Sequence, residues 1–174
     1  PQAARPRILL GQLQLSQGQA EQAYATLSVL FERLDAAAPL AATSLVKAAQ
    51  AANMTAAATP LLATHYTQQP SIDVLDALSL LEAVSPEGAA TTHQRYLDHL
   101  GQHVSLMAAA RWLSEDQQRS SPLPPSVQKT LEQAVRPLAR YRCAACGFEA
   151  KEHFWHCPGC QAWDSYPPRR IEEL

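Results

Sequence analysis

The sequence predicts a mostly α-helical protein, a solenoid of helical hairpins followed by a small C-terminal metal-binding module. The 174 residues are 47% hydrophobic but only 6% aromatic, and alanine is abundant, which is typical of packed helices. Apolar residues recur at helical spacing along most of the chain. All four cysteines lie near the C-terminus, in two Cys-x-x-Cys motifs. Each predicted element follows from one of these patterns.

The first two helices are predicted on either side of Gly18, and Asp35 and Pro39 close the pair. Their apolar positions are Ile8, Leu9, Leu10, Leu13 and Leu15, followed by Ala20, Ala23, Leu27, Leu30, Phe31 and Leu34.

This pair has the residue pattern of a tetratricopeptide repeat. Leu10-Gly11, Gly18 and Ala23 fall at the offsets of that repeat, and Leu27 occupies the large apolar position of its second helix. Small residues let the two helices of a hairpin approach closely, and larger ones fill the gap to the next hairpin. A generic helical hairpin is the alternative.

Further helices are predicted up to about residue 118. They cover residues 40–52, Thr59-Pro60 to about Gln69, Pro70-Ser71 through Leu81, Ser85-Pro86-Glu87 through Leu100, and about 103–118. Asn53 or Thr55 is expected to turn the chain. We therefore interpret residues 1–121 as tetratricopeptide-like helical repeats, whose concave face would bind another protein.

Residues 122–140 are interpreted as a linker and a connecting helix. The stretch 119–126 is rich in proline and serine and predicts a loop. A helix with Val127, Leu131 and Leu138 on one side follows, and Pro137 is expected to kink or end it at Arg136.

Residues 141–174 are interpreted as a four-cysteine metal module and its tail. The ligands are Cys143, Cys146, Cys157 and Cys160. Two Cys-x-x-Cys turns supply a closed tetrahedral shell of four sulfurs, which leaves no coordination position for a substrate. We therefore expect one structural ion. Zinc and iron both accept this shell, so the sequence does not choose between them.

The turns themselves are predicted from their glycines. Gly147, directly after the second cysteine, suits a left-handed backbone conformation. Pro158-Gly159 has the residues of a tight turn, with a positive φ allowed at Gly159. The aromatic residues of the module, Phe148, Phe154, Trp155 and Trp163, are expected to pack at least partly on the helix that contains Val127 or on its neighbour, because a free module would leave them exposed.

Other interpretations of the cysteines remain open. Two disulfides, or one redox-active Cys-x-x-Cys pair, are the alternatives to a metal site. His153 and His156 could replace a thiolate ligand, but a surface or outer-shell position is favoured for both.

The rest of the sequence shows no catalytic motif. Phosphate-binding glycine loops, His-Glu-x-x-His and Gly-x-Ser-x-Gly are missing. His99 and His103 are interpreted as surface residues, and Glu172-Glu173 as solvated charge. The arginines that flank the module, Arg140, Arg142, Arg169 and Arg170, form either a small basic rim or a solubilising surface.

Charge and hydropathy argue against two further classes of protein, those that bind nucleic acid and those that span a membrane. The net charge of −2 and a pI near 6.3 argue against a nucleic-acid partner. No stretch of about 18 apolar residues predicts a membrane span, so we expect the fragment itself to be soluble.

Two longer motifs surround the cysteines. They are Tyr141-Arg142-Cys143-x-x-Cys146-Gly147-Phe148 and Trp155-His156-Cys157-Pro158-x-Cys160-x-Ala162-Trp163. These motifs resemble the rubredoxin-type metal-binding module of the lipopolysaccharide assembly protein B (LapB) family. The degenerate repeats and the opening Arg5-Pro6-Arg7-Ile8 also fit that family.

The resemblance implies a non-enzymatic adaptor at the cytoplasmic face of the bacterial inner membrane, attached through an N-terminal anchor that this sequence lacks. The implied partners are the membrane-anchored ATP-dependent protease FtsH, the lipid A pathway deacetylase LpxC that it degrades, and an inner-membrane lipopolysaccharide-sensing regulator. A homodimer is left open. Only the four cysteines carry over as site residues, as metal ligands.

Two other functions are compared with the adaptor. One is a rubredoxin-like electron-transfer module, and the other is a zinc-ribbon module that binds nucleic acid. The metal hairpin is much shorter than that of free rubredoxins, so the resemblance does not imply electron transfer. The near-neutral charge argues against nucleic-acid binding.

Overall fold

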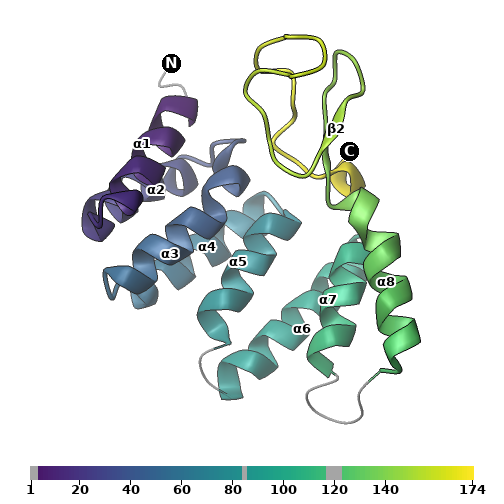
Figure 1. Ribbon diagram of the computed structural model, residues 1–174. Helices are drawn as coiled ribbons and strands as arrows, with labels where there is room; N and C mark the ends of the chain where they lie inside the picture. Colours follow the sequence, from purple (N-terminus) through teal and green to yellow (C-terminus); the bar gives the residue numbers. More distant parts are fainter. Residues whose placement is uncertain (1–3, 84–85, 117–122) are drawn as a thin grey trace. The chain divides into compact units, whose positions relative to one another are not determined.

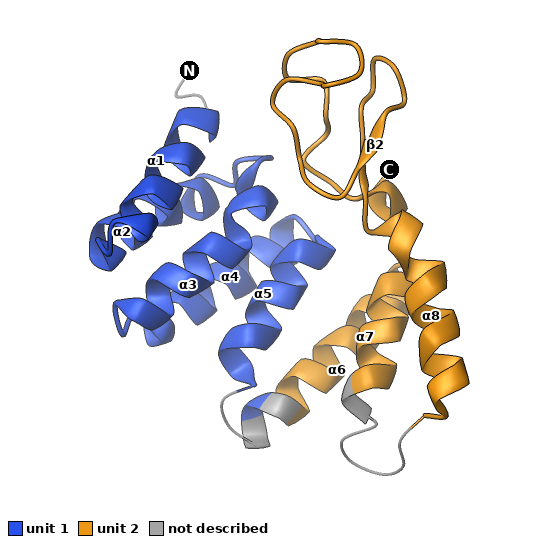
Figure 2. Cartoon of the chain, in the orientation of Figure 1, with its two compact units in different colours: residues 1–89 blue, residues 90–174 orange. Residues whose placement is uncertain are grey.

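The structure of this chain is a computed structural model that describes residues 4–83, 86–116 and 123–174. It divides into two compact units, residues 1–89 and residues 90–174 (Figure 1, Figure 2). Among the described residues there are eight α-helices and a single two-stranded antiparallel sheet. The predicted class, mostly helical with a small C-terminal module, is therefore confirmed. The tetratricopeptide character of the helices remains a prediction.

Unit 1 is a series of helices in which each packs on its neighbours in the chain. Its elements are α1 (Ala4–Ser16), α2 (Ala20–Glu32), the short 3₁₀-helix η1 (Ala38–Ala41), α3 (Ala42–Ala51), α4 (Thr55–Gln68) and α5 (Ile72–Glu82). Alanines and leucines of α2 to α5 form its buried core, as expected for an apolar stripe on each helix.

The predicted close approach of the first two helices is confirmed. Gly11 of α1 is buried, and a Cβ atom placed on it would lie 2.5 Å from the side chain of Leu27 in α2. Leu27 itself is 0% exposed, as is Ala23 one turn earlier. Gly18 has φ +77°, the conformation that lets the chain reverse between the two helices. Glycine is therefore required at both positions, for different reasons.

The predicted apolar face of α1 is only partly buried. Ile8 lies in the core, but Leu9, Leu10 and Leu13 are 48% to 54% exposed. The contacts of α1 run mainly to α2 on one side, and a single neighbouring helix covers only one stripe of another. The predicted apolar face is therefore exposed at these three leucines.

Two helix starts also differ from expectation. Residues 38–41 form η1, so the helix expected over 40–52 begins at Ala42. Asn53 turns the chain with φ 56°, and α4 then begins at Thr55, which places Pro60 inside the helix instead of in its first turn. Met54 accepts the first backbone bonds from Ala57 and Ala58, so the helix is established one turn before the proline. Pro60 has no N–H group and therefore removes one later backbone hydrogen bond of α4, but it does not determine where the helix begins.

Histidine 65 on α4 is fully buried in unit 1. Its ring contacts Phe31 of α2 edge-on, with centroids 5.2 Å apart. Burial lowers the pKa of His65 below its usual 6.5, and the nearby backbone of Asp35 opposes this only in part. The ring is thus held neutral and acts as a core residue.

Unit 2 contains the remaining helices and the C-terminal module. Its elements are α6 (Pro86–Gln102), which begins just before the boundary of the unit, α7 (Leu106–Asp116), α8 (Pro125–Leu138), β1 (Tyr141–Arg142), β2 (Glu149–Ala150) and the 3₁₀-helix η2 (Ile171–Glu173). Helix α7 packs on α8, and η2 lies against α8.

The limits of α7 and α8 refine the predicted ones. Helix α7 starts at Leu106, not at residue 103. Its C-terminal end is followed by residues 117–122, which lie outside the described residues and include the first half of the loop expected at 119–126. Helix α8 starts at Pro125, where a proline at the first position costs no backbone bond. It continues through Pro137 to Leu138, and Ala139 donates to the carbonyl of Val135. An end at Arg136, one of the two expected outcomes, is therefore wrong by two residues.

The C-terminal tail binds the start of α7. The carboxylate of Glu172 accepts hydrogen bonds from the hydroxyl of Ser105 at 2.6 Å and from the backbone N–H groups of Leu106 and Met107 at 2.6 and 3.0 Å. The first N–H groups of a helix have no partner within the helix, and a negative charge there is favourable. The expectation that Glu172 is solvated charge is wrong, because its partners lie 65 to 67 residues away in the sequence.

Next to this contact, His99 is also buried, contrary to its interpretation as a surface residue. Its ring lies 4.8 Å from that of His103. Burial lowers the pKa of His99, the charge of His103 lowers it further, and Glu172 opposes both effects.

Arginine 170 joins the tail to the end of α8. Its guanidinium donates to the carbonyl of Ala139 at 2.7 Å and lies 4.2 Å from the centre of the Tyr141 ring. Ile171 donates its N–H to the carbonyl of Arg140 at 2.8 Å. Arg170 is therefore part of the packing, whereas Arg142 forms a 2.9 Å ion pair with Glu149 across the sheet.

Replacing Glu172 with glutamine should loosen the first turn of α7. The amide keeps the shape of the carboxylate but loses its charge and one acceptor, at a cost of about 1–2 kcal/mol. Hydrogen exchange of the Leu106 and Met107 amides should accelerate, while exchange in unit 1 stays unchanged. The exposed Glu152→Gln is the matched control. Equal protection of these two amides in both variants would contradict the role of Glu172.

Candidate metal centre

The first Cys-x-x-Cys turn is the loop of the β1–β2 hairpin. Tyr141 pairs with Ala150 and Arg142 with Glu149 in this antiparallel sheet. Cys143 directly follows β1, and its N–H donates to the carbonyl of Phe148 at 2.9 Å. Gly147 donates back to the carbonyl of Cys143 at 2.9 Å and has φ +77°, as its sequence position predicts. The hairpin thus holds the two sulfurs of this turn on one side of a tight loop.

The second turn repeats these bonds in a different part of the module. The N–H of Cys157 donates to the carbonyl of Ala162, and Gln161 donates back to the carbonyl of Cys157, both at 2.9 Å. His156 and Trp163 form an isolated antiparallel bridge at the base. The residue after the second cysteine again has a positive φ, here 60° at Gln161.

Gly159 therefore has a different role from the expected one. The left-handed residue of the second turn is Gln161, the counterpart of Gly147, and Gly159 is not among the residues with positive φ. A Cβ atom on Gly159 would lie 3.2 Å from the ring of Phe148, so the glycine makes room for the aromatic residue of the first turn.

The two turns bring all four predicted ligands together. The sulfur atoms of Cys143, Cys146, Cys157 and Cys160 lie within 4.8 Å of one another. Two of the separations are 3.9 Å (Cys143 to Cys160) and 3.7 Å (Cys146 to Cys157). A zinc ion with Zn–S bonds of about 2.3 Å in a tetrahedron sets its sulfurs about 3.8 Å apart. The cysteines fit such a shell, and their separations are far from the ~2.0 Å of a disulfide.

The sulfur cluster has a buried half and an exposed half. Cys143 and Cys157 are buried, while Cys146 and Cys160 are exposed. In each turn the first cysteine therefore points into the module and the second lies at the surface.

The protonation of the cluster also favours a cation. The side chain of Ser165, followed by the backbone N–H groups of Cys146 and Ala145, lowers the pKa of Cys143 to about 6. The backbone N–H of Phe148 is the largest influence on Cys146 and lowers its pKa, but burial and the other three sulfurs together raise it to about 12. Four thiolates at this distance repel one another, and a bound dication removes that repulsion.

The two histidines of the module do not lie among the clustered ligands. The Nε2 atom of His153 lies 3.1 Å from the carbonyl oxygen of Tyr166, and its ring packs against Tyr141 and Trp155. His156 is exposed and stacks on Trp163 at 4.5 Å. Both occupy the outer positions that the sequence favoured for them.

Sequence reasoning did not identify Ser165 and Tyr166 as neighbours of the sulfurs. The hydroxyl of Ser165 lies 3.2 Å from the sulfur of Cys143. The hydroxyl of Tyr166 donates to the carbonyl of Phe148 at 3.1 Å and lies 4.0 Å from the sulfur of Cys157. Burial is the main reason why the pKa of Tyr166 is raised to about 12. The only signal in the sequence was that both residues lie shortly after the second Cys-x-x-Cys turn.

Three of the four aromatic side chains keep much of their surface accessible. Phe148, Phe154 and Trp163 are 36% to 62% exposed. The contacts described above between the module and the helices come from Arg170, Ile171 and Glu172 of the tail. The packing of an aromatic residue on α8 or its neighbour stays a prediction.

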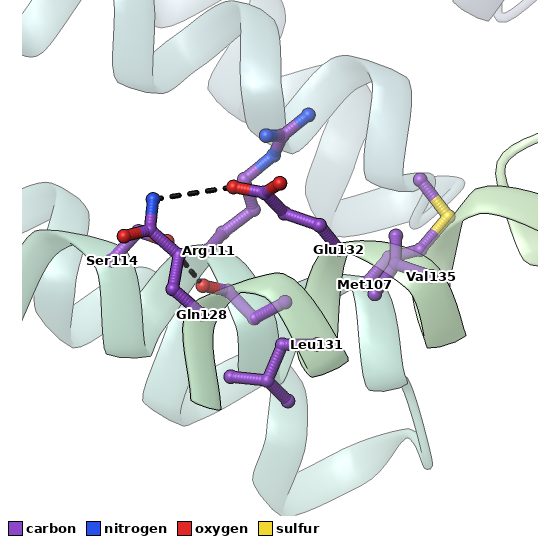
Figure 3. Close-up of a pocket in the computed structure, with 8 residues that line it drawn as sticks. Met107, Arg111, Ser114, Gln128, Leu131, Glu132 and Val135 are labelled. Atoms are coloured by element: carbon purple, nitrogen blue, oxygen red, sulfur yellow. Dashed lines mark hydrogen bonds between the residues drawn. The ribbon is translucent and has the colours of Figure 1, made fainter. Parts of the chain in front are cut away.

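A small pocket lies elsewhere in unit 2, between α7 and α8 (Figure 3). Its volume is about 140 Å³, and Gln128 donates to Glu132 along its rim at 3.2 Å. Its lining residues are Met107, Ala110, Arg111, Ser114, Gln128, Leu131, Glu132 and Val135. Arg111 and Glu132 are the ionisable groups of this lining, which does not supply a nucleophile with its base.

Comparison with known proteins finds relatives of the metal centre. Residues 141–168 match the family model described as the rubredoxin metal binding domain. Over 36 residues the chain is 53% identical to lipopolysaccharide assembly protein B of Escherichia coli strain K12. The C-terminal module is similar to the matching segment of lipopolysaccharide assembly protein B. This supports LapB family membership for the chain, as the motifs around the cysteines predicted.

The similarity to LapB proteins is concentrated at the C-terminus. The Escherichia coli match covers 21% of this chain and 9% of that protein. The protein of the same name from Haemophilus influenzae is 31% identical over 47 residues, which are 27% of this chain and 12% of that protein. The matched segments thus span about a tenth of these LapB relatives.

Among the described residues, no helix combines the length and the apolar character needed to cross a bilayer.

Proposed function

We propose that this chain is part of a non-enzymatic adaptor that regulates lipopolysaccharide synthesis. The observation that carries the proposal is the LapB-type module, whose four sulfurs lie within 4.8 Å in a closed cluster. A closed shell of four thiolates stabilises structure and offers no position to a substrate. The name of the relatives, lipopolysaccharide assembly protein B, supports the process in which the adaptor acts.

The metal ligands of the proposal are Cys143, Cys146, Cys157 and Cys160, with one zinc or iron ion. The sulfur separations of 3.7 and 3.9 Å support a tetrahedral site. When bound, the ion links the hairpin turn to the second turn, and the peptide N–H groups of both turns orient the sulfurs.

The proposed activity is the presentation of a substrate to a protease. The adaptor brings the deacetylase LpxC to the membrane-anchored protease FtsH, and an inner-membrane lipopolysaccharide-sensing regulator opposes it. The family resemblance supports these partners. The helices of unit 1, which pack as successive hairpins, support a tetratricopeptide-like docking surface. The proposed location is the cytoplasmic face of the bacterial inner membrane.

Two other functions receive less support. Electron transfer would need a site that cycles between two states of iron, whereas the family match is to an assembly protein. Binding of nucleic acid would need a basic surface, and the net charge is −2.

The deciding experiment is the half-life of LpxC in cells that carry the full-length protein with Cys143→Ser and Cys157→Ser. We expect a longer half-life and excess lipopolysaccharide, because the module no longer holds the adaptor in a productive form. The exposed Glu152→Gln variant, at the same abundance, should behave as the wild type. An unchanged half-life in the cysteine variant would reject the role of the module in this regulation.

A co-purification of the full-length, membrane-anchored protein tests the partners directly. FtsH and LpxC should be recovered together with the wild type. Recovery of neither partner would reject the adaptor function, even if the metal site is real.

A further inference from the structure

The residues that follow the second Cys-x-x-Cys turn close over the buried half of the sulfur cluster. Ser165 contacts both turns. Its carbonyl accepts the N–H of Ala144 in the first turn at 2.8 Å, and its hydroxyl lies 3.2 Å from the sulfur of Cys143. The same hydroxyl lies 3.3 Å from the carbonyl of Ala162 in the second turn. A single side chain therefore connects the two halves of the proposed site.

The hydroxyl of Ser165 can donate its proton to one of two acceptors, the carbonyl of Ala162 or the sulfur of Cys143. A free Cys143 thiol can donate its S–H to the Ser165 oxygen, and the hydroxyl then donates to the carbonyl of Ala162. A metal-bound thiolate has no proton to give. Hydrogen bonds to a charged acceptor are the stronger ones, so the hydroxyl then turns to the sulfur of Cys143.

Tyr166 differs from Ser165 in this respect. Its hydroxyl proton is already used on the carbonyl of Phe148 at 3.1 Å, and the sulfur of Cys157 lies 4.0 Å away. The Tyr166 side chain is buried, so it covers this sulfur without donating a comparable bond. The sulfurs of Cys146 and Cys160 lie on the exposed side.

We propose that Ser165 is the positioning residue of the metal site, and that its hydroxyl holds the buried ligand Cys143 so that the ion exchanges through the exposed pair Cys146 and Cys160. This inference rests on the proposed four-cysteine site. Ser165 does not itself bind the ion. It orients one ligand and stabilises the negative charge on its sulfur, as outer-shell groups do at metal sites in general.

The first test uses the full chain loaded with Co²⁺, whose absorption reports thiolate ligation. The variants are Ser165→Ala, Ser165→Thr, Tyr166→Phe and the distant control Ser126→Ala on α8. Loss of a hydrogen bond to a thiolate raises the energy of its lone pairs, so the sulfur-to-cobalt band of Ser165→Ala should shift to longer wavelength. Ser165→Thr should restore the band, and Tyr166→Phe should leave it in place.

Metal affinity gives the second readout of the same variants. Competition with a chromophoric chelator should show a loss of about 10- to 100-fold in Ser165→Ala, the usual range for an outer-shell residue. A wild-type band and an affinity within twofold in Ser165→Ala would overturn the proposal. A Ser165→Ala protein that loses affinity without a band shift, and that threonine does not rescue, would also overturn it, because this result indicates packing alone.

The proposed exchange of the ion through Cys146 and Cys160 is tested by alkylation of the zinc-loaded chain with iodoacetamide, followed by mass spectrometry. Cys146 and Cys160 should be modified first, and Cys143 should react earlier in Ser165→Ala than in Ser126→Ala. Equal rates for all four cysteines would overturn the assignment of the exposed pair. A wild-type chain that binds neither zinc nor Co²⁺ would instead reject the metal site itself, which keeps the two failures distinguishable.

Discussion

Replacing Cys143 with serine is expected to unfold residues 141–168 and leave unit 1 intact. The module has little core of its own, since Tyr141, Cys143, Cys157 and Tyr166 are its buried side chains among those described. A unit of this size cannot bury enough apolar surface to fold alone. Structural zinc supplies an apparent ~10–16 kcal/mol in small metal-dependent folds, so loss of one thiolate removes most of the stabilisation.

Hydrogen exchange and elemental analysis of the full chain measure this result. The amides of Cys143 and Cys157, which are bonded to Phe148 and Ala162 in the wild type, should exchange rapidly in Cys143→Ser. Metal content should fall well below one ion per chain. Ala144→Ser is the matched control, because Ala144 is an exposed residue of the same turn. Full protection together with one bound ion in Cys143→Ser would show that the fold does not depend on this ligand.

Replacing Leu27 with alanine is expected to be the most damaging single change in unit 1. Leu27 of α2 is 0% exposed and fills the space beside Gly11 of α1. Truncation of a fully buried leucine leaves a cavity and costs about 2–5 kcal/mol. For a unit of this length, such a loss lowers the melting temperature by on the order of 10 °C or more.

Exchange of the α1 and α2 amides during urea unfolding measures the loss in this unit. Leu13→Ala, which truncates a leucine that is 54% exposed, should change stability by less than about 1 kcal/mol. Gly11→Ala should be harmful alone, because its Cβ meets Leu27 at 2.5 Å. It should be tolerated in the Leu27→Ala chain. Additive effects of the two changes would contradict the close packing of this pair.

The features that were predicted correctly from the sequence are those that depend on short segments of the chain. The spacing of two residues within each Cys-x-x-Cys turn fixes the geometry locally, and the four ligands follow from it. The left-handed conformation of Gly147 and the turn at Gly18 are also local, as is the helical spacing of leucines and alanines. The small residue Gly11 and the large residue Leu27 predicted their contact because both sit at fixed positions of one helical hairpin.

Helix ends were harder to predict. Proline constrains its own φ and the residue before it, but bonds and packing elsewhere in the helix can outweigh that constraint. Pro60 lies inside α4 and Pro137 in the last turn of α8. A proline therefore marks a helix boundary only when the surrounding bonds agree.

By itself, the sequence determined the helical class of this protein and the identity of its four clustered cysteines, because both depend on residues a few positions apart. Only the tertiary structure decided that Ile8 of α1 is buried while Leu9, Leu10 and Leu13 stay exposed, and it placed Glu172 on α7 and Ser165 beside Cys143. Those contacts join residues 22 to 67 positions apart. They depend on the path of the whole chain, and no local pattern of charge or hydropathy encodes that path.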